Sequence, residues 1–234
     1  MARVVAADSP QLGGRVALVT AAANDAGRAV ARALANAGAN VIAVDESRRG
    51  EKHSRGSFRT IAADATDESS VAALVHRCLD EFGSIDILVN TAGSLQSVPL
   101  EKITEAAWQR AMRINLVSAF LCSKAIVPSM LARRSGRIIN LTVAEAFTGA
   151  KNSAHYAAAA GGMLGFSKSL ALELAPHNIT VNTICPDPYA APRRKFPPGA
   201  FAGAALFLAG DEAAYVTGQT LFVDGKAVYG LAKA

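Results

Sequence analysis

The segment RVALVTAAANDAGRAVARALANAGANVIAVD, Arg15–Asp45, holds two short apolar runs separated by an alanine-rich stretch. The runs Val16–Thr20 and Asn40–Val44 have the length and the β-branched content of strands. Arg28–Ala37 lies between them and stops at Gly38, a residue that commonly follows the last turn of a helix. The segment therefore predicts a strand, a crossover helix and a second strand parallel to the first.

The same alternation of apolar runs and helical patterns continues to the end of the chain. Strands that are apolar on both faces belong to parallel sheets covered by helices on both sides, and their crossovers are right-handed. We therefore expect one doubly wound, Rossmann-like α/β domain over residues 15–234, after a tail at residues 1–14. Further strands are expected at Phe58–Ala62, Ile85–Asn90, Arg137–Leu141, Ile179–Ile184 and Thr220–Val223, and further helices at Asp67–Phe82, Thr104–Ala132, Tyr156–Ala175 and Phe201–Ala209.

The composition is that of an ordinary folded protein, with 51% hydrophobic and 18% charged residues among 234. Met1–Gly14 lacks the continuous apolar stretch of a signal peptide, so we expect a cytoplasmic protein. The net charge of +5 comes largely from two basic stretches, Arg48–Arg59 and Arg193–Lys195, which contain no run of interleaved aromatic residues. Solvated loop charge explains this pattern, so we expect neither a nucleic acid nor a membrane as partner.

Several segments, spread in order from Arg15 to Gly230, carry a resemblance to a known family. They are RVALVT (Arg15–Thr20), DILVNTAG (Asp86–Gly93), INLVSAF (Ile114–Phe120), GRIIN (Gly136–Asn140), HYAAAAGGMLGFSKSLALEL (His155–Leu174), ITVNTICP (Ile179–Pro186) and YVTGQTLFVDG (Tyr215–Gly225). With these segments the chain resembles the short-chain dehydrogenases/reductases. That resemblance implies the doubly wound fold and hydride transfer between a nicotinamide and a carbonyl or alcohol.

The resemblance also implies roles for particular residues. Tyr156 stands at the position of the acid/base tyrosine, and Asn115 at that of the asparagine that holds a proton-relay water. Val143 occupies the position of the serine that holds the substrate oxygen, and Ala160 that of the lysine that lowers the tyrosine pKa. Because an unassisted tyrosine has a pKa near 10, only about one molecule in a thousand is ionised at neutral pH. We therefore expect slow alcohol oxidation, although a neutral Tyr156 can still donate a proton.

The expected phosphate turn after the first strand departs from the family's three-glycine pattern. Ala21 and Asp25 replace the first two glycines, and Gly27 remains. A carboxylate in the first helical turn accepts free backbone N–H groups, so we expect Asp25 to occupy the place of the cofactor phosphate. At the adenosine end, Asp45 is expected to accept a ribose hydroxyl, which favours NAD over NADP, but Arg48 and Arg49 follow soon after and leave that preference open. The other positions that match the family on the adenine side are Asp64, Asn90 and Gly93, which can equally serve as structural turns.

The remaining pocket suggests acid/base chemistry. Glu145 follows Val143 by two residues, so on an extended segment both side chains point to the same face. Asp187 comes from the neighbouring loop, where the family has a glycine. Glu145, Tyr156 and Asp187 together suggest a proton-transfer enzyme, an isomerase, dehydratase or cyclase, with a raised carboxyl pKa. Alternatively, each acid is a solvated or salt-bridged loop residue.

Three function classes stay open at this stage. The leading hypothesis is a repurposed non-redox enzyme acting on a small organic molecule, with no cofactor and at most low-affinity NAD(H). The first alternative is a weak or atypical NAD(P)-dependent oxidoreductase, a ketoreductase or dehydrogenase. The second is a non-catalytic partner subunit of an oligomer. Relatives assemble through helices that match Thr104–Ala132 and Tyr156–Ala175, so we expect a homo-oligomer, a dimer or tetramer. No cysteine or histidine spacing suggests a metal site.

Overall fold

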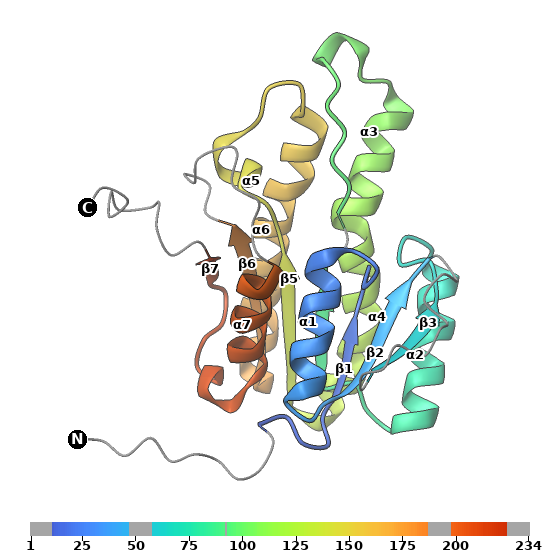
Figure 1. Ribbon diagram of the computed structural model, residues 1–234, viewed down its shortest axis with the longest axis vertical. Helices are drawn as coiled ribbons and strands as arrows, with labels where there is room; N and C mark the ends of the chain where they lie inside the picture. The colour runs from blue at the N-terminus through green and yellow to red at the C-terminus, as the bar shows by residue number, and fades with distance from the viewer. Residues whose placement is uncertain (1–10, 47–57, 92, 187–197, 224–234) are drawn as a thin grey trace, which may run out of the picture.

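The computed structural model describes residues 11–46, 58–91, 93–186 and 198–223, which form an α/β sandwich around one parallel sheet (Figure 1). The sheet has seven strands in the order β3-β2-β1-β4-β5-β6-β7, and every neighbouring pair is parallel. The doubly wound fold expected from the sequence is confirmed. The strands are β1 Val16–Val19, β2 Asn40–Asp45, β3 Phe58–Ala62, β4 Ile87–Asn90, β5 Gly136–Leu141, β6 Ile179–Pro186 and β7 Thr220–Val223.

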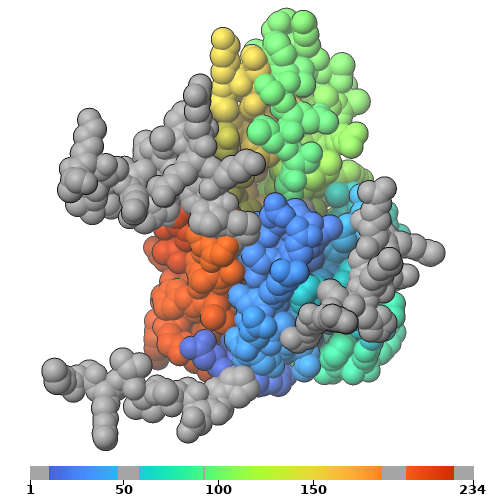
Figure 2. Space-filling model, in the orientation of Figure 1, coloured from blue at the N-terminus to red at the C-terminus, as the bar shows by residue number. Residues whose placement is uncertain are grey.

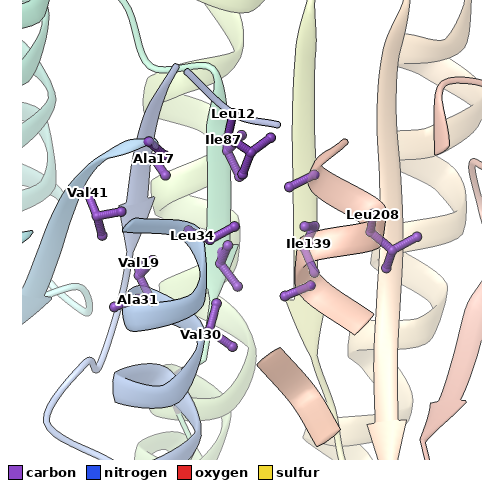
Figure 3. Close-up of a cluster of buried hydrophobic side chains, with 14 of the residues drawn as sticks. Leu12, Ala17, Val19, Val30, Ala31, Leu34, Val41, Ile87, Ile139 and Leu208 are labelled. Atoms are coloured by element: carbon purple, nitrogen blue, oxygen red, sulfur yellow. The ribbon is translucent and has the colours of Figure 1, made fainter. Parts of the chain in front are cut away.

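Two layers of helices bury the sheet. The helices are α1 Asp25–Asn36, α2 Glu68–Phe82, α3 Glu105–Met112, α4 Ser118–Arg133, α5 Glu145–Thr148, α6 Ala154–Leu174 and α7 Pro198–Ala209. Alternate residues of each strand enter opposite cores, because neighbouring side chains on a strand point to opposite faces. Ala17 and Val19 of β1 pack against α1 and α7, as Figure 3 shows for the first of these cores. Val16 and Leu18 pack against α2, α4 and α6 on the other face.

The segment before β1 belongs to the first core. Leu12 is fully buried, and its backbone N–H donates to the carbonyl of Ala37 at the end of α1 (2.9 Å). Leu12 lies among the labelled core side chains of Figure 3. Part of the expected tail at residues 1–14 is therefore packed against the domain.

The long helix expected at Thr104–Ala132 is interrupted. α3 and α4 are joined by one π-helical turn at Arg113–Val117, which contains Asn115. A π turn inserts an extra residue into the helical ladder and is common at functional sites. The pattern of apolar residues predicted the helix but not this turn.

The continuous helical stretch Glu105–Arg133 is long and apolar enough to cross a membrane, judged by length and composition alone. Its most apolar window has a mean hydropathy of 1.6, and 44% of that window is buried inside the protein. Leu121, Ile126 and Met130 of α4 lie in the second core. The stretch is therefore best explained as the core helix of a folded domain, which passes the same test.

Gly27 and Gly165 provide a matched pair of substitutions that tests the packing of α1 on the sheet. A Cβ atom at Gly27 would lie 2.6 Å from the Oγ1 of Thr91 and 2.7 Å from the carbonyl oxygen of Ala21. A Cβ atom at Gly165 of α6 would have no neighbour within 4 Å. We expect Gly27→Ala to lower the free energy of unfolding by about 1–3 kcal/mol through overpacking. Gly165→Ala should raise it by roughly 0.5–1 kcal/mol, because alanine is the better helix former.

Urea denaturation of the two variants and the unsubstituted protein measures both effects. Opposite signs are expected. A Gly27→Ala variant as stable as the unsubstituted protein would contradict the close packing at the start of α1.

Candidate functional site

The candidate site residues predicted from the sequence, where the structure describes them, lie near the carboxyl ends of the strands. The strand order reverses between β1 and β4, and in doubly wound sheets ligands bind at such a switch point. The β1–α1 turn, the ends of β2 and β4, and the segment after β5 meet at this edge, where α5 and the first turn of α6 rise above the strands (Figure 1). Figure 2 shows that α1 and α7 fill the near face below this edge.

The β1–α1 turn keeps the backbone shape of a glycine turn although its first glycine is absent. Ala21 has φ 47°, in the left-handed region that glycine adopts most easily. The N–H of Ala22 donates to the carbonyl of Val44, and the N–H of Ala23 donates to the Asp45 carboxylate at 3.0 Å. The turn is therefore bound to the end of β2, and its strained residue is held in place by these neighbours.

Asn24, and not Asp25, caps α1. The Asn24 side-chain oxygen accepts the N–H of Gly27 at 2.7 Å, and its amide nitrogen donates to the carbonyl of Thr91 at 3.0 Å. Asp25 is exposed and its carboxylate pairs with Arg28 at 2.5 Å. The expectation that Asp25 occupies the phosphate position is wrong, because its side chain turns outward along the helix.

The cap formed by Asn24 and the hydrogen bonds of Thr91, a residue of the matched segment Asp86–Gly93, were not expected from the sequence. Thr91 is buried, its N–H donates to the Thr20 hydroxyl at 3.1 Å, and its own hydroxyl donates to the Thr20 carbonyl. The signal for Asn24 was available, since asparagine just before a helix is a preferred N-cap whose side-chain oxygen accepts a backbone N–H of the first turn. Thr91 had no comparable signal, because its role depends on the pairing of β1 with β4.

Two of the five expected cofactor residues have their side chains engaged in turns. Asp64 accepts hydrogen bonds from the backbone N–H and the hydroxyl of Thr66, both at 2.7 Å, at the entry to α2. Asp45 is half-buried at the end of β2 and receives the Ala23 N–H. Asp45 is therefore at the edge where a ribose would lie, whereas Asp64 shapes a neighbouring turn.

The end of β4 carries a buried polar chain. The Asn90 amide donates to the side-chain oxygen of Asn140 on β5 at 2.8 Å, and the Asn140 amide donates to the hydroxyl of Ser167 on α6 at 2.8 Å. The side-chain oxygen of Asn90 is buried and has no hydrogen-bond partner among the described residues. This chain fixes β4 and β5 to α6, so Asn90 acts on the site through the placement of α6.

Asn115 holds the segment that leaves β4. Its side-chain oxygen accepts the N–H of Ser94 at 2.8 Å, and its amide donates to the carbonyls of Ala111 (2.8 Å) and Ser94 (3.3 Å). A Cβ built at the exposed Gly93 would lie 3.6 Å from the same Asn115 oxygen. The π turn thus directs Asn115 toward Gly93 and Ser94, so the structure brings together two of the predicted positions.

Tyr156 is buried in the first turns of α6. Burial and, to a smaller extent, the nearby charge of Glu145 together raise the pKa of its phenol from the ordinary value of 10.0 to about 12. The phenol is therefore a proton donor over the whole neutral range. The structure brings Glu145 and Tyr156 into electrostatic contact, as expected from the sequence.

The positions of the missing serine and lysine are filled by apolar groups. Val143 is half-buried after β5, and Ala160 is buried one helical turn beyond Tyr156. The hydroxyl of Thr142 donates to the backbone carbonyl of Ala160 at 3.2 Å, so it is committed to α6 and does not replace the serine. Tyr156 consequently lacks a cationic neighbour at residue 160.

Glu145 does not lie on an extended segment. It begins the short helix α5, in which the N–H of Gly149 donates to its carbonyl at 3.1 Å. The two-residue alternation expected for Val143 and Glu145 is therefore wrong, although the packing of α5 on α6 still brings Glu145 near Tyr156. Asp187, the remaining predicted catalytic residue, lies outside the described residues.

His155 is buried beside Tyr156 in sequence, and its Nδ1 has no hydrogen-bond partner within the described part of the chain. No role is assigned to His155. No group of three or more His, Cys, Asp or Glu residues in the described ranges could hold a metal ion.

Comparisons with known proteins agree with this geometry. Residues 15–196 match the model of the short chain dehydrogenase family. The 3-oxoacyl-[acyl-carrier-protein] reductase FabG of Vibrio cholerae is 38% identical over 92% of this chain and 97% of its own length, and that of Escherichia coli K12 is 37% identical over 91% and 96%. A crystal structure from Burkholderia xenovorans, described as a short-chain dehydrogenase/reductase, covers 97% of this chain and 99% of its own with a TM-score of 0.84 and 34% identity.

These relatives overturn two expectations. They match this chain over almost their whole length, and they are named as reductases. This finding contradicts the leading hypothesis of a non-redox isomerase, dehydratase or cyclase and supports the oxidoreductase alternative. The expectation of no cofactor falls with it, since reduction by such relatives requires a hydride donor. The physical reason is that Val143, Ala160 and Ala21 change side chains, while the described turn after β1 keeps its backbone shape. From its fold, its matched segment and its relatives, the chain belongs to the short-chain dehydrogenase family.

Proposed function

We propose that the protein is an NAD(P)H-dependent reductase that converts a ketone on a small organic molecule into an alcohol. The observation that carries this proposal is the buried, protonated Tyr156 at the carboxyl edge of the sheet, in a chain whose relatives are named as 3-oxoacyl reductases. The names of those relatives suggest a 3-oxo group as the reducible carbonyl. The bound dinucleotide would supply the hydride, and the chain would supply the proton.

The residues around the β1–α1 turn fit a dinucleotide. A helix N-terminus with free backbone N–H groups is a binding site for phosphate. Among the described residues, the N–H of Gly27 is capped by Asn24, while no acceptor is found for the N–H groups of Asp25 and Ala26. Asp25 leaves the position open because it pairs with Arg28. We therefore assign the pyrophosphate to this turn and a ribose to Asp45, with NADH preferred over NADPH because the carboxylate repels a second phosphate.

The raised pKa of Tyr156 sets the protonation state of the acid/base group. Alcohol oxidation uses the tyrosine as a base, whereas carbonyl reduction uses its proton. With a pKa of about 12 the phenol is almost entirely protonated at neutral pH. The phenol is therefore in the state that carbonyl reduction requires, which agrees with the activity named for the relatives.

Val143 and Ala160 limit the rate and leave the reaction class unchanged. Without a hydroxyl at residue 143, the developing alkoxide receives one hydrogen bond fewer, and such a loss costs about 2.7–4 kcal/mol in known cases. Without a lysine at residue 160, nothing at that position lowers the phenol pKa. We expect a slow reductase whose turnover rises when these groups are restored.

Ultraviolet titration of the phenol tests the electrostatic part of the proposal. The difference between the unsubstituted protein and Tyr156→Phe isolates this one tyrosine, and we expect it to ionise near pH 12, above the ordinary 10.0. Because the folded-state pKa is raised, the stability that the neutral phenol contributes is present below about pH 10 and is lost as the pH rises toward 12. An isolated titration at or below pH 10 would contradict the assignment.

Activity assays test the reaction itself. With NADH or NADPH and acetoacetyl-CoA as a soluble 3-oxoacyl probe, we expect slow consumption of reduced cofactor and a loss of about 10²–10⁴-fold in kcat for Tyr156→Phe. The double variant Val143→Ser, Ala160→Lys should be faster than the unsubstituted protein. Turnover that does not depend on a reduced dinucleotide, or that survives Tyr156→Phe unchanged, would refute the proposal.

We further propose that the protein is a homo-oligomer assembled through α4 and α6. Phe120 of α4 is 43% exposed and packs edge-to-face on Phe166 of α6, with ring centroids 6.4 Å apart. Leu172, farther along α6, is 80% exposed. Large exposed apolar side chains of this kind are typical of subunit contacts. Light scattering should give at least twice the mass of the chain, and Phe120→Glu should reduce it; a monomer at micromolar concentration would contradict this proposal.

A further inference from the structure

We propose that Glu145 makes the site select ketones that carry a positive charge, such as a protonated or quaternary amine, close to the reacting carbonyl. The proposal rests on the proposed reductase function, and it narrows the substrate class of the same site. It concerns a specificity-determining residue, Glu145, which lies near Tyr156 because α5 packs on α6.

The packing of α5 on α6 positions Glu145. A Cβ built at Gly161 of α6 would lie 3.9 Å from the carbonyl oxygen of Ala146, so the first turn of α5 lies against the middle of α6. The bond from Thr142 to the Ala160 carbonyl fixes the chain just before α5 to the same turn of α6. Tyr156 precedes Ala160 by four residues and so lies on the same face of the helix. Glu145 thus begins a helix that packs on the half of α6 that carries Tyr156.

The charge around this face is negative. Glu145 is half-buried, and its carboxylate forms no ion pair with any of the described residues. At residue 160 an alanine contributes no charge. The Tyr156 phenol is neutral at physiological pH, because burial and, to a smaller extent, the Glu145 charge raise its pKa to about 12.

A half-buried carboxylate without a cationic partner attracts a cation more strongly than a solvated one does, because less water screens it. A ketone with an ammonium group near its carbonyl would therefore be held with that group toward Glu145. A ketone with a carboxylate in the same position would be repelled. A neutral ketone would gain nothing from Glu145, so charge at this position would discriminate between substrates of the same shape.

Two isosteric ketones test this selection. Trimethylammonioacetone carries a permanent positive charge, and neopentyl methyl ketone has the same shape with a carbon in place of the nitrogen. Both kcat/KM with reduced cofactor and the dissociation constant by calorimetry would be measured for the unsubstituted protein, Glu145→Gln and Glu145→Asp. Glu173→Gln is the control, because Glu173 is an exposed acid about 25 Å from Tyr156 along α6.

We expect the unsubstituted protein and Glu173→Gln to favour the charged ketone about tenfold in both measurements. Glu145→Gln should bring the ratio near one, and Glu145→Asp should keep part of the preference. Equal affinities in the unsubstituted protein, or a preference that survives Glu145→Gln, would overturn the inference. Selective binding that depends on Glu145, with no turnover of either ketone, would support the inference and count against the reductase proposal.

Discussion

The close approach of α1 to the ends of β1 and β4 is the constraint on which the site depends. Gly27 lies so near Thr91 and the Ala21 carbonyl that a single methyl group would collide with both. Thr91 in turn bonds to Thr20 with its N–H and its hydroxyl, and Asn24 joins the Gly27 N–H to the Thr91 carbonyl. The helix N-terminus is thereby fixed at the switch point of the sheet. This contact explains how the turn keeps its shape with alanine at residue 21, since the surrounding bonds hold a backbone conformation that alanine alone disfavours.

The electrostatics of the other half of the site follow from burial and from one carboxylate. Tyr156 is enclosed by α6 and its surroundings, so its ionised form is disfavoured, and Glu145 disfavours it further. In this environment the tyrosine is suited to give a proton and poorly suited to remove one. Glu145, which adds to the effect of burial on the phenol pKa, would also attract a cation. One carboxylate would therefore act both on the acid/base group and on the choice of substrate.

The fold could be predicted from the sequence because it depends on periodicity, which is local. The apolar runs Val16–Thr20 and Ile85–Asn90 predicted strands, which the structure has as β1 Val16–Val19 and β4 Ile87–Asn90, and the alternation with helices predicted the parallel sheet. The details of the site depend on contacts between distant segments. The outward turn of Asp25, the π turn at Asn115 and the helix at Glu145 each required knowledge of what packs against them. Asn24 was the exception, because an N-cap signal is local and could have been recognised.

The function hypothesis was wrong for a related reason. Ala21, Asp25, Val143 and Ala160 were interpreted as the loss of a redox site, yet a missing side chain lowers a rate by a finite factor and leaves the backbone framework in place. Equilibrium titration of NADH and NADPH by fluorescence tests the central claim most directly. Saturable binding is predicted for the unsubstituted protein, stronger for NADH than for NADPH and weakened by Asp45→Ala. No detectable binding of either dinucleotide at millimolar concentration would contradict a reductase built on this turn.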